Sequence, residues 1–153
     1  MEKLNVAIAD DNERMVQLLD NVVSSDEELQ VVGKAGDGEQ LYEIIKEKEP
    51  DIVLLDIIMP KVDGLTVMDR VNRDSSLRKR PAFIVISAVG QEKITEDAFA
   101  LGADYYILKP FDNAMVINQI KRVKRGADRN FSEVRKVNAY VKKAEYMERN
   151  LET

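Results

Sequence analysis

The chain has 153 residues, of which 44% are hydrophobic and 33% charged, a balance typical of a folded, soluble domain rather than a disordered one. It contains no cysteine and no histidine, which excludes disulfides, thiolate metal sites and histidine chemistry on this chain. No apolar run is long enough to span a membrane and the N-terminus lacks a signal-peptide pattern, so we expect a cytoplasmic protein without membrane contact.

The charge is unevenly distributed along the chain. Residues 121–153 contain ten basic and five acidic residues, a net charge of +5. The first 120 residues contain 13 basic and 23 acidic residues, a net charge of −10. This asymmetry predicts a boundary near residue 126, with one globular domain over residues 1–126 and a distinct segment over residues 127–153.

Short apolar segments alternate with segments of helical periodicity. The predicted strands are Leu4–Ala9, Leu29–Ala35, Ile52–Leu55, Phe83–Ile86 and Asp104–Leu108. Each is followed by apolar residues spaced three and four apart, which indicates a helix with one buried face. These inward-facing residues are Met15, Leu18, Leu19, Val22 and Val23; Leu41, Ile44 and Ile45; Leu65, Met68 and Val71; Ile94, Ala98 and Leu101; and Val116, Ile117, Ile120 and Val123. Gly102 and Gly126 are expected to end the last two helices.

This alternation predicts an α/β fold with a parallel sheet covered by helices on both faces. Right-handed crossovers favour the five-stranded, doubly wound, flavodoxin-like order 2-1-3-4-5, with five flanking helices. Because strands one and three are neighbours in this order, the residues that follow them lie at one edge of the sheet.

Asp56 directly follows the unbroken apolar run Ile52–Leu55. A carboxylate in apolar surroundings is costly unless another group compensates its charge. Its place at the carboxyl end of a buried strand is where open α/β sheets bind their ligands. On this segment alone, the alternative that Asp56 merely caps a turn stays open, although Asp63 is better placed to cap the next helix.

Four other polar residues follow predicted strands at the same edge: Asp10, Asp11, Ser87 and Lys109. Three neighbouring carboxylates favour an oxygen-preferring divalent cation such as Mg²⁺. A carboxylate can also attack phosphorus, and a lysine and a cation would neutralise the transferring phosphoryl group. Lys109 as a surface lysine and Ser87 as a loop hydroxyl are the simpler alternatives, but their joint placement favours a phosphoacceptor site.

Together these motifs resemble the receiver domain of bacterial two-component response regulators over residues 3–125. The motifs are Asp10-Asp11, Asp56, Met59-Pro60, Asp63-Gly64, Ser87-Ala88, Tyr106 and Lys109-Pro110. The longer segments 6–12, 55–60, 88–92 and 105–112 are similar to the receivers of sporulation transcription factors. The resemblance implies a signalling phosphoacceptor that catalyses only its own phosphorylation and dephosphorylation, rather than an enzyme.

The resemblance also implies residue roles. Asp56 would accept the phosphoryl group and Lys109 would pair with it. Mg²⁺, or Mn²⁺ or Ca²⁺ in its place, would be bound by Asp11, Asp56 and the backbone carbonyl of Ile58, with Asp10 acting through water.

A second set of implied roles concerns the switch. Ser87 and Tyr106 would move together on phosphorylation and change the surface of the fourth helix, fifth strand and fifth helix. The alternative for Tyr106 is a half-exposed strand aromatic. The bond between Lys109 and Pro110 is expected to be cis.

Ile58 and Val89, each two residues after a site residue, are expected to flank the mouth of the site. Because neither apolar side chain can orient an attacking water, we predict a long-lived phosphoryl group suited to transcription.

The implied partners are a phosphotransfer protein or histidine kinase as donor, facing the first helix and the loop after strand five, and also a phosphatase. Residues 127–153 carry an apolar stripe, which predicts a sixth helix that links to a C-terminal DNA-binding domain absent from this chain. The stripe residues are Phe131, Val134, Val137, Val141, Ala144, Met147 and Leu151. Four alternatives stay open for the stripe: it packs on its own domain, pairs with a second chain, changes partner on phosphorylation, or serves as a solvated connector. A homodimer is expected on phosphorylation, and DNA would be contacted only through the missing domain.

Two rival functions share this fold. One is an FMN-binding module, although three acids at the rim would repel its phosphate. The other is a receiver-like protein-interaction module that is never phosphorylated.

Overall fold

The computed structural model describes residues 3–59 and 61–127. Its elements are β1 (Leu4–Ala9), α1 (Glu13–Ser24), β2 (Leu29–Ala35), α2 (Gly38–Lys48), β3 (Ile52–Leu55), α3 (Gly64–Arg73), β4 (Ala82–Ser87), α4 (Glu92–Ala100), β5 (Tyr105–Leu108) and α5 (Asn113–Ala127). The five strands form one sheet in the order β2-β1-β3-β4-β5, and every neighbouring pair is parallel. The predicted fold class is therefore confirmed.

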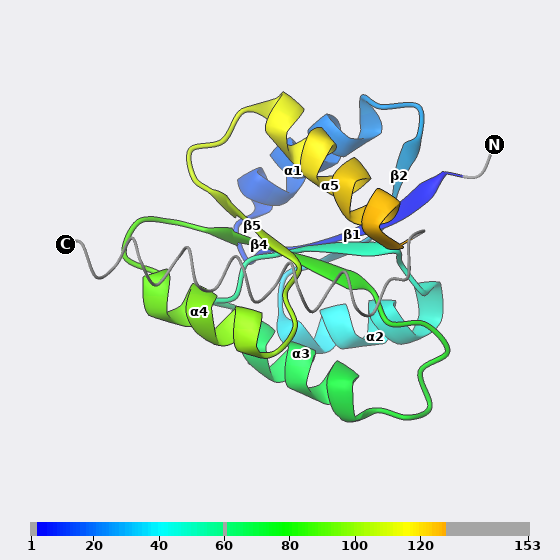
Figure 1. Ribbon diagram of the computed structural model, residues 1–153, viewed down its shortest axis with the longest axis vertical. Coiled ribbons are helices and arrows are strands. Elements are labelled where there is room, and N and C mark those ends of the chain that lie inside the picture. Colours follow the sequence, from blue (N-terminus) through cyan, green and yellow to red (C-terminus); the bar gives the residue numbers. More distant parts are fainter. Residues whose placement is uncertain (1–2, 60, 128–153) are drawn as a thin grey trace.

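The sheet separates two hydrophobic cores. Helices α1 and α5 cover one face, and α2, α3 and α4 cover the other (Figure 1). Because side chains alternate along a strand, β1 contributes Val6 and Ile8 to the core under α1 and α5, and Ala7 and Ala9 to the other. The three central strands, β1, β3 and β4, are buried over most of their length, which explains their continuous apolar sequences.

The helix faces follow the predicted periodicity with two corrections. Leu18 is 43% exposed, because the face of α1 that meets the sheet is the narrower set Leu19, Val22 and Val23. Leu101 packs against the core as predicted, but it is the C-cap of α4 rather than part of the helix, and Gly102 follows it with a φ of 102°, as expected for a glycine that ends a helix. Tyr42, Val67 and Phe99 also belong to the core and were not predicted.

The loop after β3 is fixed against α2. Gly38 approaches this loop so closely that a Cβ there would lie 2.0 Å from the carbonyl oxygen of Val62. Lys61, with a φ of 64°, pairs with Asp37 at 3.5 Å, and Asp37 in turn caps α2. The Gly64 amide donates to the Ile57 carbonyl at 2.8 Å, which closes the loop that follows Asp56.

No helix among residues 3–59 and 61–127 is long and apolar enough to cross a membrane. The predicted linker helix over residues 127–153 falls almost wholly outside the part of the chain that the structure describes.

Candidate functional site

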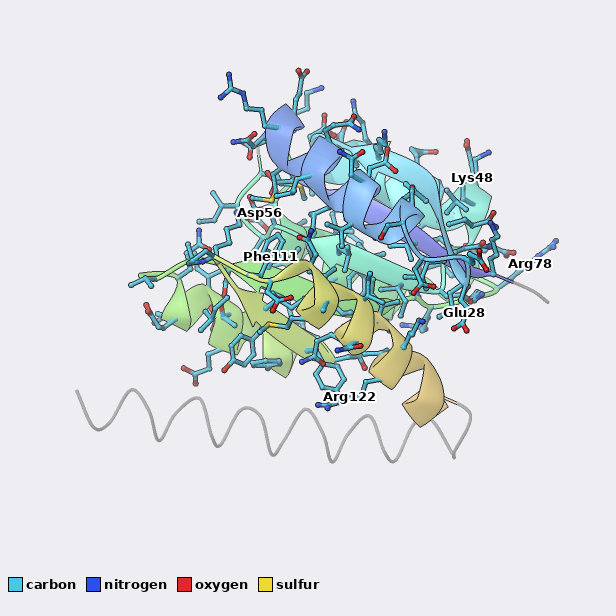
Figure 2. All side chains as sticks on the ribbon, turned by 90° about the horizontal axis from the view of Figure 1, so that it is seen from above. Glu28, Lys48, Asp56, Arg78, Phe111 and Arg122 are labelled. Atoms are coloured by element: carbon cyan, nitrogen blue, oxygen red, sulfur yellow. The ribbon has the colours of Figure 1, made fainter. Side chains whose placement is uncertain are left out.

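The predicted acidic residues meet at the carboxyl edge of the sheet. Ala9 lies opposite Leu55 in the β1–β3 pair, and the Asp56 amide donates to the Ala9 carbonyl at 2.9 Å, so Asp10 and Asp56 emerge side by side. Asp10, Asp11 and Asp56 each offer a carboxylate oxygen, and these atoms all lie within 4.8 Å of one another. In Figure 2, Asp56 lies at one end of the molecule, together with Phe111, and Lys48 and Arg78 lie at the other.

The three carboxyl groups differ in exposure. Asp10 is buried, Asp56 is half-buried and Asp11 is exposed. Burial, and next the charge of Asp10, raises the pKa of Asp56 to about 6. Burial is also the main cause that raises the pKa of Asp10. Ionising both groups near neutral pH is therefore unfavourable unless a cation compensates their charge.

Local hydrogen bonds orient these carboxylates. Asp10 Oδ1 accepts from the amide of Asn12 at 2.9 Å, and Asp56 Oδ1 accepts from the amide of Ile58 at 3.1 Å. Asn12 also caps α1 through its own side chain, so the first turn of that helix and the Asp10 carboxylate form one connected unit. This role of Asn12 was missed, although an asparagine just before an amphipathic helix is a recognisable cap.

Lys109 and Ser87 lie beside the acids. Lys109 Nζ is 3.9 Å from Asp10 Oδ2, a contact that brings a positive charge to the cluster. The Lys109 amide donates to the Ser87 carbonyl at 2.8 Å, and the Ser87 side chain is buried. The peptide bond between Lys109 and Pro110 is cis.

The two apolar residues expected at the mouth of the site are exposed. Ile58 is 50% exposed and Val89 is 87% exposed. They follow β3 and β4 respectively, so they lie on the loops that frame the carboxyl edge.

Tyr106 is half-buried against α4. Its ring meets that of Phe99 edge to face, with centroids 5.7 Å apart and planes at 75°. β5 and α4 therefore meet at this contact between two rings.

A groove of about 500 Å³ adjoins the acidic cluster. Asp10, Asp11, Glu13, Lys34 and Gln40 are among its lining residues, so it runs from the cluster along the first turn of α1 and the end of β2.

Gln91 was also missed by the sequence analysis. Its side-chain oxygen accepts from the Ala88 amide at 2.8 Å, directly after Ser87. A glutamine in a polar loop carries no sequence signal for such a bond, because its partner is a backbone group.

Comparison with known proteins assigns residues 6–121 to the response regulator receiver domain. Similar structures include the receiver domain of NarL from Mycobacterium tuberculosis, with 29% identity, a TM-score of 0.75, and coverage of 82% of this chain and 99% of that one. The receiver domain of AraT from Geobacillus stearothermophilus has 28% identity, a TM-score of 0.72, and coverage of 82% and 95%.

A third similar structure is the CheX–CheY–BeF3–Mg²⁺ complex from Borrelia burgdorferi, with 34% identity, a TM-score of 0.70, and coverage of 80% and 90%. None of these findings supports the FMN alternative. Receiver domains are signalling modules that bind Mg²⁺ at an acidic cluster, and this chain has such a cluster. The chain belongs to the response regulator receiver domain family.

Proposed function

We propose that this chain is a Mg²⁺-dependent phosphoacceptor in which Asp56 receives the phosphoryl group. The observation that carries this proposal is the convergence of Asp10, Asp11 and Asp56 within 4.8 Å, with Lys109 beside them. The raised pKa values of Asp10 and Asp56 show that these two acids are unfavourable for the fold alone, and they become useful when a cation and a phosphoryl group occupy the site.

The donor set fits Mg²⁺. The three carboxylates provide only oxygen ligands, as this ion prefers. Asp11, Asp56 and the Ile58 carbonyl would bind it directly, Asp10 would act through water, and Mn²⁺ or Ca²⁺ could take its place. When bound, the ion neutralises charge on the transferring phosphoryl group.

Three residues of the chain would take part in the transfer reaction. An Asp56 carboxylate oxygen attacks phosphorus, the phosphorus–nitrogen bond of a donor phosphohistidine breaks, and an acyl phosphate forms. The Lys109 ammonium pairs with a phosphoryl oxygen, and the Ser87 hydroxyl donates to another. Reorientation of Ser87 and Tyr106 would alter the surface of α4, β5 and α5.

On the basis of the sequence resemblance, we also propose a biological role in the control of sporulation. Four segments, including residues 105–112, are similar to the stage-zero sporulation master regulator of endospore-forming Firmicutes. The chain would receive its phosphoryl group in the cytoplasm from a phosphotransfer protein or histidine kinase and lose it to a phosphatase. Residues 127–153 would lead to a DNA-binding domain. The groove along α1 offers the donor a surface next to Asp56.

Incubation with Mg²⁺ and acetyl phosphate is expected to add one phosphoryl group to the chain, because Asp56 displaces acetate from phosphorus. Intact mass measures the gain. Asp56→Asn is expected to gain nothing, whereas the control Asp69→Asn, which alters an aspartate paired only with Arg73 on the surface of α3, gains as the parent does. No gain by the parent, with Mg²⁺ binding confirmed, would favour the unphosphorylated interaction module.

The acyl phosphate is expected to last minutes or longer, because apolar Ile58 and Val89 frame the site and cannot orient water. Ile58→Asn should speed its hydrolysis about tenfold, since an amide can position the attacking water. Loss of the phosphoryl mass with time measures both rates. Leu18→Asn, at an exposed leucine on α1, serves as the control. A parent lifetime of seconds, or equal rates for parent and Ile58→Asn, would contradict this expectation.

The phosphorylated chain is expected to dimerise, because the switch alters an exposed surface that includes Leu108 and Met115. Sedimentation of phosphorylated and unphosphorylated samples over a range of concentrations tests this. Monomers in both states at high concentration would remove dimerisation from the proposal.

The burial of Asp56, together with the neighbouring charge of Asp10, predicts a pH-dependent stability. In the folded chain Asp56 has a pKa of about 6, above its unfolded value of 3.8, so without metal its contribution to stability is lost as pH rises from about 4 to about 6. Asp56→Asn should therefore be more stable than the parent at pH 7, by about 1–3 kcal/mol.

Denaturant unfolding of both proteins between pH 4 and pH 8 measures this difference. Mg²⁺ should stabilise the parent at pH 7 and have much less effect on Asp56→Asn. A difference between the two proteins that does not change between pH 4 and pH 6 would show that Asp56 is not destabilised by its surroundings.

A further inference from the structure

The loop between β4 and α4 is closed by a reciprocal pair of hydrogen bonds between Ala88 and Gln91. The Ala88 amide donates to Gln91 Oε1 at 2.8 Å, and the Gln91 amide donates to the Ala88 carbonyl at 3.1 Å. The side chain of Gln91 thus turns back toward the sheet, and although it stands at the N-cap position of α4, it makes no capping hydrogen bond there.

The backbone of Gln91 is anchored independently of its side chain. The amide and hydroxyl of Thr95, which is buried, both donate to the Gln91 carbonyl, at 3.0 and 2.8 Å. Gly90 has a φ of 96°, and its amide donates to Glu92 Oε1 at 2.9 Å. A change of the Gln91 side chain therefore leaves the turn and the first turn of α4 in place.

The register of the strands puts the Ala88 amide at the phosphoacceptor edge. Leu55 lies opposite Val85, so Asp56 follows β3 one residue beyond this pair, and Ser87 and Ala88 follow on the neighbouring strand. Adjacent strands lie about 4.8 Å apart. A phosphoryl group on the Asp56 carboxylate extends outward over this edge, where a backbone N–H is a suitable donor to an anionic oxygen.

We propose that Gln91 is a positioning residue. Its side-chain oxygen accepts the hydrogen bond from the Ala88 amide that a phosphoryl oxygen would otherwise accept, and occupation of the site displaces the Gln91 side chain. This inference rests on the proposed phosphorylation of Asp56. In the displaced state Ala88 donates to the phosphoryl group, and the Gln91 side chain leaves the loop that joins Ser87 to α4.

The exchange is favourable but carries a cost. A hydrogen bond from an amide to a charged phosphoryl oxygen is about twice as strong as one to a neutral amide oxygen. The Ala88 amide therefore donates to the phosphoryl group rather than to Gln91 when both acceptors are present. The neutral bond must nevertheless be broken first, and its net strength lowers affinity for the occupying group by about 3- to 10-fold. Gln91 therefore sets how readily the site is occupied.

The alternative is that Gln91 only stabilises the loop. The two interpretations predict opposite changes in affinity for the group that occupies the site when the Gln91 acceptor is removed. Loss of a structural bond loosens the loop and weakens binding, whereas loss of a competitor strengthens binding.

The test uses Gln91→Met, which keeps the length of the side chain but removes its strong acceptor. Beryllofluoride with Mg²⁺ is the probe, with Mg²⁺ alone as the reference. Titration is expected to show about 3- to 10-fold tighter beryllofluoride binding by Gln91→Met than by the parent. Glu92→Gln, which alters the neighbouring side chain that bonds Gly90, is expected to bind as the parent does.

A second readout follows the Ala88 amide directly by NMR. Without beryllofluoride, its proton should exchange with solvent faster in Gln91→Met than in the parent, and with beryllofluoride the two proteins should show the same amide shift. Equal or weaker binding by Gln91→Met, or an Ala88 amide that does not respond to beryllofluoride, would overturn the role of Gln91. Absence of both beryllofluoride binding and phosphorylation in the parent would overturn the proposed function as well.

Discussion

The burial of two neighbouring carboxyl groups, those of Asp10 and Asp56, is the constraint on which the rest of the site depends. Burial is the main cause that raises the pKa of both carboxyl groups; the charge of Asp10 raises that of Asp56 further, and the charge of Asp11 raises that of Asp10. An uncompensated pair of this kind costs stability near neutral pH. The two hydrophobic cores of the sheet stabilise the fold despite this loss of stability. At the edge of the sheet, Lys109 supplies one positive charge to the pair, and a metal ion can supply more.

The position of each site residue depends on strand register more than on loop conformation. Parallel pairing of β1 with β3 fixes Asp10 beside Asp56, and pairing of β4 with β5 fixes Ser87 beside Lys109. The close approach of Gly38 to Val62 and the pair between Asp37 and Lys61 then restrain the loop after Asp56 from the α2 side. The fold itself therefore holds the acids together, as the proposed cation site requires.

The sequence was sufficient to predict the strands, their order and the convergence of the acids, because buried parallel strands leave continuous apolar runs that point to their carboxyl ends. It was insufficient for Leu18, because a stripe of apolar residues gives the direction of a helix face but not its width. It was also insufficient for the contact of Phe99 with Tyr106 and for the bond from Ala88 to Gln91. Both depend on how α4 is set against the sheet, which local periodicity does not encode.

The start of α4 lacks the side-chain cap that α1, α2 and α3 have. Asn12, Asp37 and Asp63 cap α1, α2 and α3 through their side chains, whereas Gln91 makes no such bond to α4. Elements with fewer local restraints open at lower free energy than the core. The Gln91 side chain instead accepts from the Ala88 amide, next to Ser87. In the proposed mechanism this one hydrogen bond links occupation of the site to release of the loop before α4. Under the proposed roles of Asp56 and Gln91, phosphorylation would reach the surface of α4 by exchange of one hydrogen-bond acceptor at the Ala88 amide, without disturbance of the two cores beneath it.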